Sequence, residues 1–134
     1  MSKGHRSQIK KERNEQNKDT RPKAHAKYIR ISDQKAKIVL DQIKGKGIRE
    51  ATALLNYSPR YAAEIIGKVL KSAVANAENN LGMDAAKLFI EEAYANRGKS
   101  QYSRFRLRAR ARGRGNRIER KVSHISIILN ERPK

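Results

Sequence analysis

Six arginines alternate with apolar or small residues between positions 104 and 114, in the segment RFRLRARARGR. They are Arg104, Arg106, Arg108, Arg110, Arg112 and Arg114. In a helix these side chains would point in all directions, whereas in a strand alternate side chains share one face. A strand at ~3.3 Å per residue would spread them over roughly 33 Å. Because unpaired guanidinium groups are costly to remove from water, no protein core could bury this row, and its length favours a polyphosphate backbone as partner.

Three interpretations of the arginine row are open: a disordered basic tail, a nuclear localisation signal, or an ordered RNA-binding arm. The alternation, and the strand pattern that resumes after it, favour the ordered arm. Arginine outnumbers lysine nine to two in residues 97–121, which suits bidentate phosphate contacts and stacking on bases. Aromatic side chains that could stack on single-stranded bases are few, with Tyr102 and Phe105 as the candidates, so we expect recognition of the backbone and shape of folded RNA. Beyond the row itself, the predicted RNA-binding residues are Lys99, Arg117, Arg120, Lys121 and His124.

The charge is distributed unevenly along the 134 residues, which carry a net +19. Residues 97–121 hold eleven basic residues and one acidic residue, whereas residues 28–96 hold ten and eight. A nearly neutral segment is typical of a foldable domain, and strongly basic flanks are typical of electrostatic appendages. We therefore expect a flexible basic extension at 1–22 and a single domain at 23–134. Within that domain, residues 98–122 form the predicted arm.

Helices and strands alternate through the central part of the chain. A strand is expected at 26–31, followed by helices at 34–44 and 48–55. Ser58-Pro59 is typical of a helix start and predicts a third helix that reaches residue 79. A strand follows at 87–96. The arm then turns near 112–116, where glycine and asparagine accept positive φ, and the chain returns in a half-buried strand at Ile125, Ile127 and Leu129.

Several kinds of site are disfavoured by the residues present. The chain has no cysteine, which excludes disulfides and thiolate sites. Its three histidines lack partners at metal-ligand spacing, and Gly98-Lys99-Ser100 lacks the glycine that a phosphate-binding loop requires at position 93. Glu91 and Glu92 are adjacent, so on a strand they should face opposite sides and form no catalytic pair. We predict neither a cofactor, nor a metal, nor an enzymatic activity. Without a long apolar run, the sequence also predicts an intracellular protein that is not in a membrane.

Three segments resemble the family of large-subunit ribosomal protein L twenty-two: KAHAKYIRISDQKAKIVLDQIKGK at 23–46, SAVANAENN at 72–80 and RARGRGNRIERKVSHISIIL at 110–129. The similarity covers about residues 23–131. It implies an α+β fold with three helices packed on a small antiparallel sheet and a long protruding β-hairpin. Residues 1–22 extend beyond the usual start of the family, so the resemblance implies no role for them.

The resemblance also implies a function for the arm. The hairpin would pass among several segments of large-subunit rRNA to the wall of the nascent-peptide exit tunnel. Its tunnel-facing tip would consist of Arg110, Ala111, Arg112, Gly113 and Arg114, near the constriction and the macrolide pocket, with Ser123 and His124 at its base. Ala109 and Gly115 replace the proline and alanine common around the family's tip.

The main hypothesis is a structural constituent of the large ribosomal subunit that binds rRNA, supports assembly and lines the tunnel. Its partners would be rRNA, neighbouring large-subunit proteins and the nascent peptide, in the cytoplasmic ribosome, with no membrane and no self-oligomer. The alternative is a free nucleic-acid chaperone or a nucleoid-type DNA-binding protein, which would bind duplex DNA and structured RNA with comparable affinity. A nuclease is a distant third, because no ligand set for a divalent metal supports it.

Overall fold

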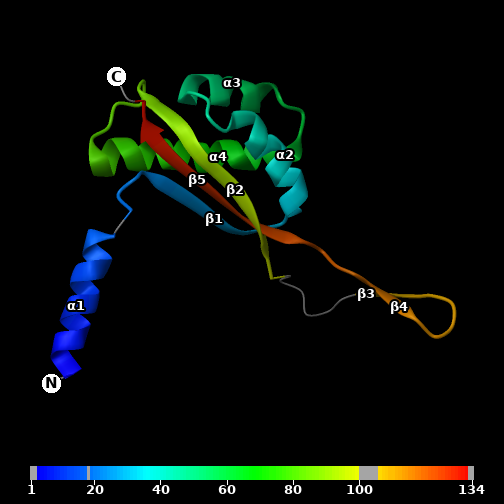
Figure 1. Ribbon diagram of the computed structural model, residues 1–134. Helices are drawn as coiled ribbons and strands as arrows, with labels where there is room; N and C mark the ends of the chain where they lie inside the picture. Colours follow the sequence, from blue (N-terminus) through cyan, green and yellow to red (C-terminus); the bar gives the residue numbers. More distant parts are fainter. Residues whose placement is uncertain (1–2, 18, 100–105, 133–134) are drawn as a thin grey trace.

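Three antiparallel strands form the sheet at the centre of the structure (Figure 1). The computed structural model describes residues 3–17, 19–99 and 106–132. β5 (Val122–Glu131) lies between β1 (Lys23–Ile29) and β2 (Leu88–Gly98) and pairs with both. The chain therefore places its most apolar strand, which carries Ile125, Ile127 and Leu129, in the middle of the sheet, where all three side chains are fully buried. The predicted strand is confirmed, but it is buried on both faces rather than one, because Ser126 and Ile128 on the opposite face are also buried between β1 and β2.

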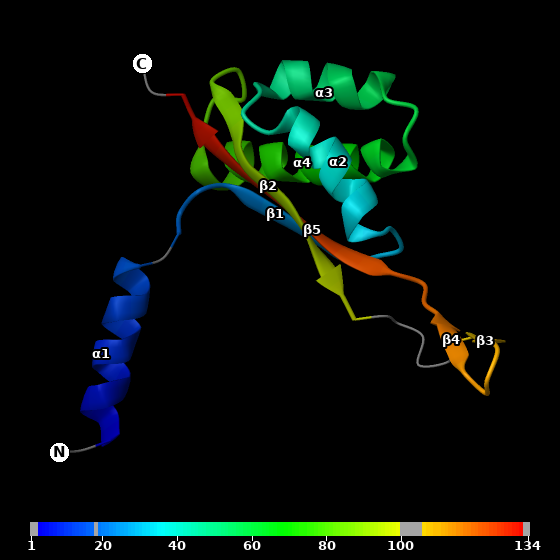
Figure 2. The same ribbon diagram turned by 45° about the vertical axis from the view of Figure 1, so that its right-hand side comes forward.

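Three helices cover one face of this sheet: α2 (Asp33–Ile43), α3 (Ile48–Tyr57) and α4 (Tyr61–Leu81) (Figures 1 and 2). Helices α2 and α4 contact the sheet, and α3 packs on α4. Small buried side chains let α4 approach its neighbours closely, because alanine adds little width to a helix face. These buried residues are Ala62, Ala63, Ala73 and Ala77. We call the sheet with these three helices the body, and it confirms the predicted α+β class.

A fourth helix precedes the body, so the expected number of three helices was too small. Helix α1 (Lys3–Gln16) extends away from the sheet in both views (Figures 1 and 2). Residues 7–17 are all exposed. Ile9 is the only large aliphatic side chain of this helix, so the sequence offers no apolar stripe that would have predicted it. The flexibility expected for residues 1–22 stays a prediction.

The predicted start of the long helix at Ser58-Pro59 was wrong. Ser58 instead ends α3, with its N–H donating to the carbonyl oxygen of Leu54 at 3.1 Å. Proline disfavours the helical conformation in the residue before it, and Ser58 accordingly has an extended ψ of 123°. Arg60 is also extended, with ψ 130°, so that α4 begins at Tyr61.

Adjacent carboxylates on β2 converge on one arginine, contrary to the expectation that Glu91 and Glu92 face opposite sides. The pairing of β2 with β5 shifts register between Ile90 and Glu92, and such a bulge re-aims the side chains around it. Arg21 donates from Nη1 to Glu91 Oε2 at 2.8 Å and to Glu92 Oε1 at 3.1 Å. Its Nε donates to Asp19 Oδ1 at 3.0 Å. The cluster therefore ties the segment before β1 to an edge strand of the sheet, which is a structural role.

The Arg21 cluster predicts a shifted titration of Asp19. Hydrogen bonds from the side chain and the backbone N–H of Arg21 lower the pKa of Asp19 from 3.8 to about 2. Because the folded pKa lies below the unfolded one, this interaction stabilises the fold above pH ~4 and is lost as the pH falls towards 2. We expect NMR titration of the Asp19 carboxyl to give a midpoint near 2, and Arg21→Gln to return it towards 3.8.

Lys71→Gln is the matched control, since it removes one positive charge from the exposed side of α4. It should leave the Asp19 midpoint unchanged. An unaltered midpoint in Arg21→Gln would contradict the assignment of the shift to Arg21.

Candidate nucleic-acid interface

A two-stranded ribbon projects from the body on the side opposite to α1 (Figures 1 and 2). It consists of β3 (Arg106–Ala109) and β4 (Gly115–Ile118), which pair with each other and with no other strand. Every residue from 106 to 121 is exposed, including the apolar Leu107 and Ile118. The ribbon has no core of its own, and isolated hairpins of this kind are only marginally stable in water.

The tip of the ribbon is a tight turn centred on Arg112 and Gly113. Both residues have positive φ, 58° and 68°, as the two central residues of a type I′ hairpin turn require. The N–H of Arg114 donates to the carbonyl oxygen of Ala111 at 3.4 Å, and the N–H of Arg110 donates to that of Arg114 at 2.8 Å. The turn was expected near residues 112–116. The observed turn spans only residues 111–114, because two residues with positive φ are enough to reverse the chain.

The arginine row folds back on itself, so the prediction of six arginines along one side of a single strand was wrong. In the ribbon Arg106 lies opposite Ile118 and Arg108 opposite Asn116. Residues directly opposite each other in an antiparallel pair share a face. Arg106, Arg108 and Arg110 therefore share one face with Arg114, and Arg112 occupies the tip. The cationic face is shorter and denser than predicted.

The arm begins where β2 and β5 stop pairing. Gly98 lies opposite Val122 in the last pair of their register. Next to this pair, Arg97 at the end of β2 donates from Nη2 to Oε2 of Glu119 in the arm, at 2.8 Å. Glu119 is the only acidic residue of 97–121. The ion pair thus joins the two sides of the arm at its base and neutralises the one carboxylate there.

His124 occupies the base of the arm, half-buried on β5. The backbone N–H of Tyr28 donates to His124 Nδ1 at 3.0 Å, and the two rings meet edge to face with centroids 4.8 Å apart. Because Nδ1 accepts this bond, the neutral ring carries its proton on Nε2. That nitrogen would lie 3.0 Å from a Cβ at position 98, so the bare backbone of Gly98 makes room for it. His124 therefore packs at the base of the arm, and its predicted contact with RNA stays a prediction.

The predicted RNA-binding residues are brought onto one projection, with two exceptions. His124 lies within the sheet of the body, and Arg104 falls outside the described residues, as do Tyr102 and Phe105. Lys99 follows the end of β2, and five residues of the row occupy the ribbon and its turn. The return segment, which runs from the turn to β5 (residues 114–121), also holds Arg117, Arg120 and Lys121.

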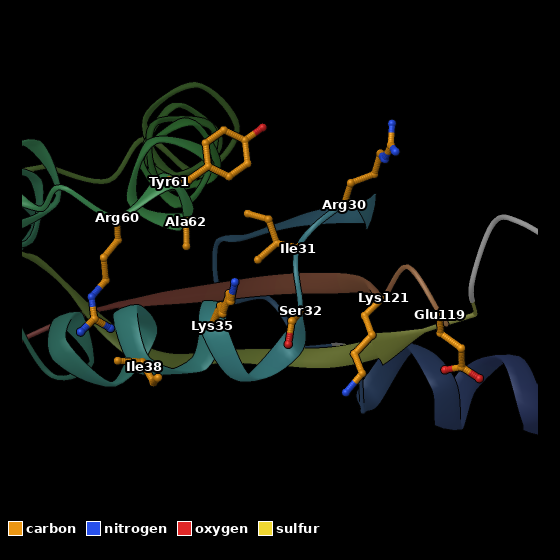
Figure 3. Close-up of a pocket in the computed structure, with 10 residues that line it drawn as sticks. All are labelled: Arg30, Ile31, Ser32, Lys35, Ile38, Arg60, Tyr61, Ala62, Glu119 and Lys121. Carbon is orange, nitrogen blue, oxygen red and sulfur yellow. The ribbon is translucent and has the colours of Figure 1, made fainter. Parts of the chain in front are cut away.

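Sequence reasoning missed a groove beside the base of the arm. It has a volume of about 660 Å³ and combines three separate parts of the chain (Figure 3). Its lining consists of Arg30, Ile31, Ser32, Lys35, Ile38, Arg60, Tyr61, Ala62, Glu119 and Lys121. Only Lys121 belongs to the predicted set. The other cations are isolated in sequence, and only the fold brings them together.

Two other kinds of site have no counterpart in the part of the chain that the structure describes. No group of three or more histidines, aspartates or glutamates there could hold a metal ion. None of the helices within residues 3–17, 19–99 and 106–132 is both long enough and apolar enough to cross a bilayer.

Comparison with known proteins agrees with this geometry. The family described as "Ribosomal protein L22p/L17e" matches residues 24–130. The chain belongs to this family. Its members are ribosomal proteins, which confirms the resemblance and the prediction that the chain is a structural protein without enzymatic activity.

Curated relatives extend the similarity over nearly the whole chain. The large ribosomal subunit protein uL22 of Lachnospira eligens is 58% identical over 132 residues, which cover 98% of this chain and 100% of the relative. The protein of the same name from Lachnoclostridium phytofermentans is 55% identical with the same coverage. That of Clostridium tetani is 50% identical over 110 residues, 82% of this chain and 96% of the relative.

The close approach at the base of the arm predicts opposite effects for two glycine substitutions. In Gly98→Ala the new methyl group would lie 3.0 Å from His124 Nε2 and 3.2 Å from the carbonyl oxygen of Val122. His124 cannot move freely because Tyr28 holds it, so we expect a loss of about 1 kcal/mol in unfolding free energy. In Gly67→Ala, within α4, a Cβ meets nothing within 4 Å, and the gain should be about 0.5–1 kcal/mol.

Urea denaturation of the full chain measures both effects. If Gly98→Ala proved as stable as the unmodified protein, His124 would not be fixed at the base of the arm as described.

Proposed function

We propose that this protein is a structural component of the large ribosomal subunit and binds large-subunit rRNA through its arm. The observation that carries the proposal is the exposed ribbon of residues 106–118, in which five of six arginines lie on one face and the tip. Membership of a ribosomal protein family supports it. The relatives that match nearly the whole chain are themselves named large-subunit proteins.

The physical case is that the ribbon needs a counter-charge that the protein does not provide. Arg110 and Arg114 face each other across the turn, and opposed like charges on paired strands are destabilising. Glu119 is the only acidic residue of 97–121, and Arg97 already binds it. Phosphate oxygens of RNA suit the planar guanidinium group because each can accept paired hydrogen bonds from it. Folded rRNA would therefore supply both the charge and the support that the ribbon needs.

The finer parts of the proposal rest on the family resemblance. The arm contacts several rRNA segments and supports subunit assembly, and neighbouring large-subunit proteins contact the body. The tip, Arg110 to Arg114, lines the nascent-peptide exit tunnel and meets the nascent peptide. The protein acts in the cytoplasmic ribosome, as a single copy. Family membership favours this role over a free nucleic-acid chaperone or a nucleoid-type DNA-binding protein.

Salt dependence tests the electrostatic basis of RNA binding. With about eight phosphates neutralised, log affinity for a large-subunit rRNA transcript should fall against log salt with a slope of about −6 to −7. The double variant Arg108→Gln/Arg110→Gln should reduce the magnitude of this slope by roughly 1.4–1.8, since two phosphate contacts are lost. The control Lys71→Gln/Lys87→Gln has the same net charge and should keep the slope. A slope shallower than about −2 would remove the electrostatic argument.

Replacing residues 106–118 with Gly-Ser-Gly tests whether the arm is separable from the body. Because every residue removed is exposed, the unfolding free energy should change by less than about 0.5 kcal/mol. The variant should no longer remain with large subunits during sedimentation in high salt, whereas the full chain should. Loss of folding would contradict a separable arm. A full chain that binds duplex DNA as tightly as rRNA and leaves the subunits in high salt would support the chaperone or nucleoid alternative instead.

A further inference from the structure

The groove beside the base of the arm joins the body to the cationic return segment. Tyr61 and Arg60 come from the start of α4, Lys35 and Ile38 from α2, and Lys121 from the arm. Figure 3 shows Ile31 and Lys35 between the start of α4 on one side and Glu119 and Lys121 on the other. The volume of about 660 Å³ lies within the ~300–1,000 Å³ of sites that hold a small molecule.

The polar lining of the groove is suited to an anion. Glu119 is its one carboxylate, and the ion pair with Arg97 at 2.8 Å neutralises it. Within the described residues, the side chains of Lys35, Arg60 and Lys121 form no hydrogen bond or ion pair. Three cations that converge on one hollow without a carboxylate to balance them raise the local positive potential.

The apolar lining is more than a phosphate group alone would need. The Tyr61 side chain is 69% exposed and that of Ile38 49% exposed, although both border a hollow that also contains the buried Ile31 and Ala62. An exposed aromatic ring beside cations is the arrangement with which proteins hold unpaired bases, because the base stacks on the ring and its phosphate meets the charge.

We propose that the groove holds one unstacked nucleotide of the bound RNA, with its base against Tyr61 and its phosphate between Lys35 and Lys121. This inference rests on the proposed function and adds to it a contact with a base. Lys121 belongs to both the arm and the groove, so an RNA strand lying on the arm continues directly into the hollow. Phosphate contacts along the ribbon do not determine which nucleotide lies at which position, whereas one base bound in the groove fixes the register of the RNA.

Binding of two oligonucleotides to the full chain tests the proposal. The probes are a single-stranded adenosine pentamer and an abasic pentamer with the same number of phosphates. The adenosine pentamer should bind at least about fivefold more tightly, because only its bases can stack. Tyr61→Ala should abolish this ratio, and Tyr61→Phe should keep it. Tyr57→Ala is the matched control, since Tyr57 is 94% exposed and lies outside the groove.

The hairpin variant Arg108→Gln/Arg110→Gln separates the two proposals. It should weaken binding of both pentamers by the same factor and leave their ratio unchanged. A ratio of one in the unmodified protein, or a ratio that survives Tyr61→Ala, would overturn the nucleotide site. If the protein still bound the rRNA transcript with a steep salt dependence, the proposed function would stand without it. Failure to bind the transcript would instead overturn the proposed function.

Crosslinking in assembled subunits identifies the occupant of the groove directly. A photoreactive phenylalanine analogue at position 61 should crosslink to rRNA. A crosslink to a neighbouring protein would overturn the proposal and show that a protein segment fills the groove.

Discussion

Pairing of β5 with both of its neighbours is the constraint on which the structure depends. It buries Ile125, Ile127 and Leu129 beneath the helices, and it sets the point at which the arm leaves the sheet, opposite Gly98 and Val122. The same strand holds His124 in place against Tyr28. Core, arm and base are therefore positioned by one ladder of backbone hydrogen bonds.

The distribution of charge also separates the body from the arm. In the body, acidic residues nearly balance the basic ones, and the bulge on β2 brings Glu91 and Glu92 to one arginine. In the arm, the single carboxylate is already paired with Arg97. The fold thus satisfies its own charges where it has a core and leaves cations exposed where it has none. Because of this separation, the body can fold by itself while the cationic surface of the arm stays exposed for a polyanion.

Periodicity was the most reliable guide in the sequence. The alternation at Ile125, Ile127 and Leu129 identified the strand that lies at the centre of the sheet. It succeeded because these three side chains share the face that is buried beneath the helices. The arginine alternation correctly indicated a strand, and the glycines and asparagine indicated a turn near 112–116. The reversal comes earlier than expected because Arg112 adopts positive φ, which is uncommon for arginine.

Features that depend on contacts between distant segments could not be predicted. The register shift at Glu91 follows from how β2 meets β5 rather than from a local pattern. The groove lies between residues separated by up to 91 positions, from Arg30 to Lys121, and only Lys121 was singled out from its own segment. Helix α1 carries no apolar stripe, so it lacks the hydrophobic pattern by which most helices are predicted.

The position of β5 in the order of the chain has a consequence for biosynthesis. β1 and β2 do not pair with each other, and Lys23 at the start of β1 pairs with Ile128 in β5. Long-range pairing of this kind slows folding, because the entropy of closing the loop is lost before the stabilising contacts form. The ribosome that makes this protein must translate the entire cationic arm before the sheet can close, so a nascent chain presents its arginines to nearby polyanions while its body is still open.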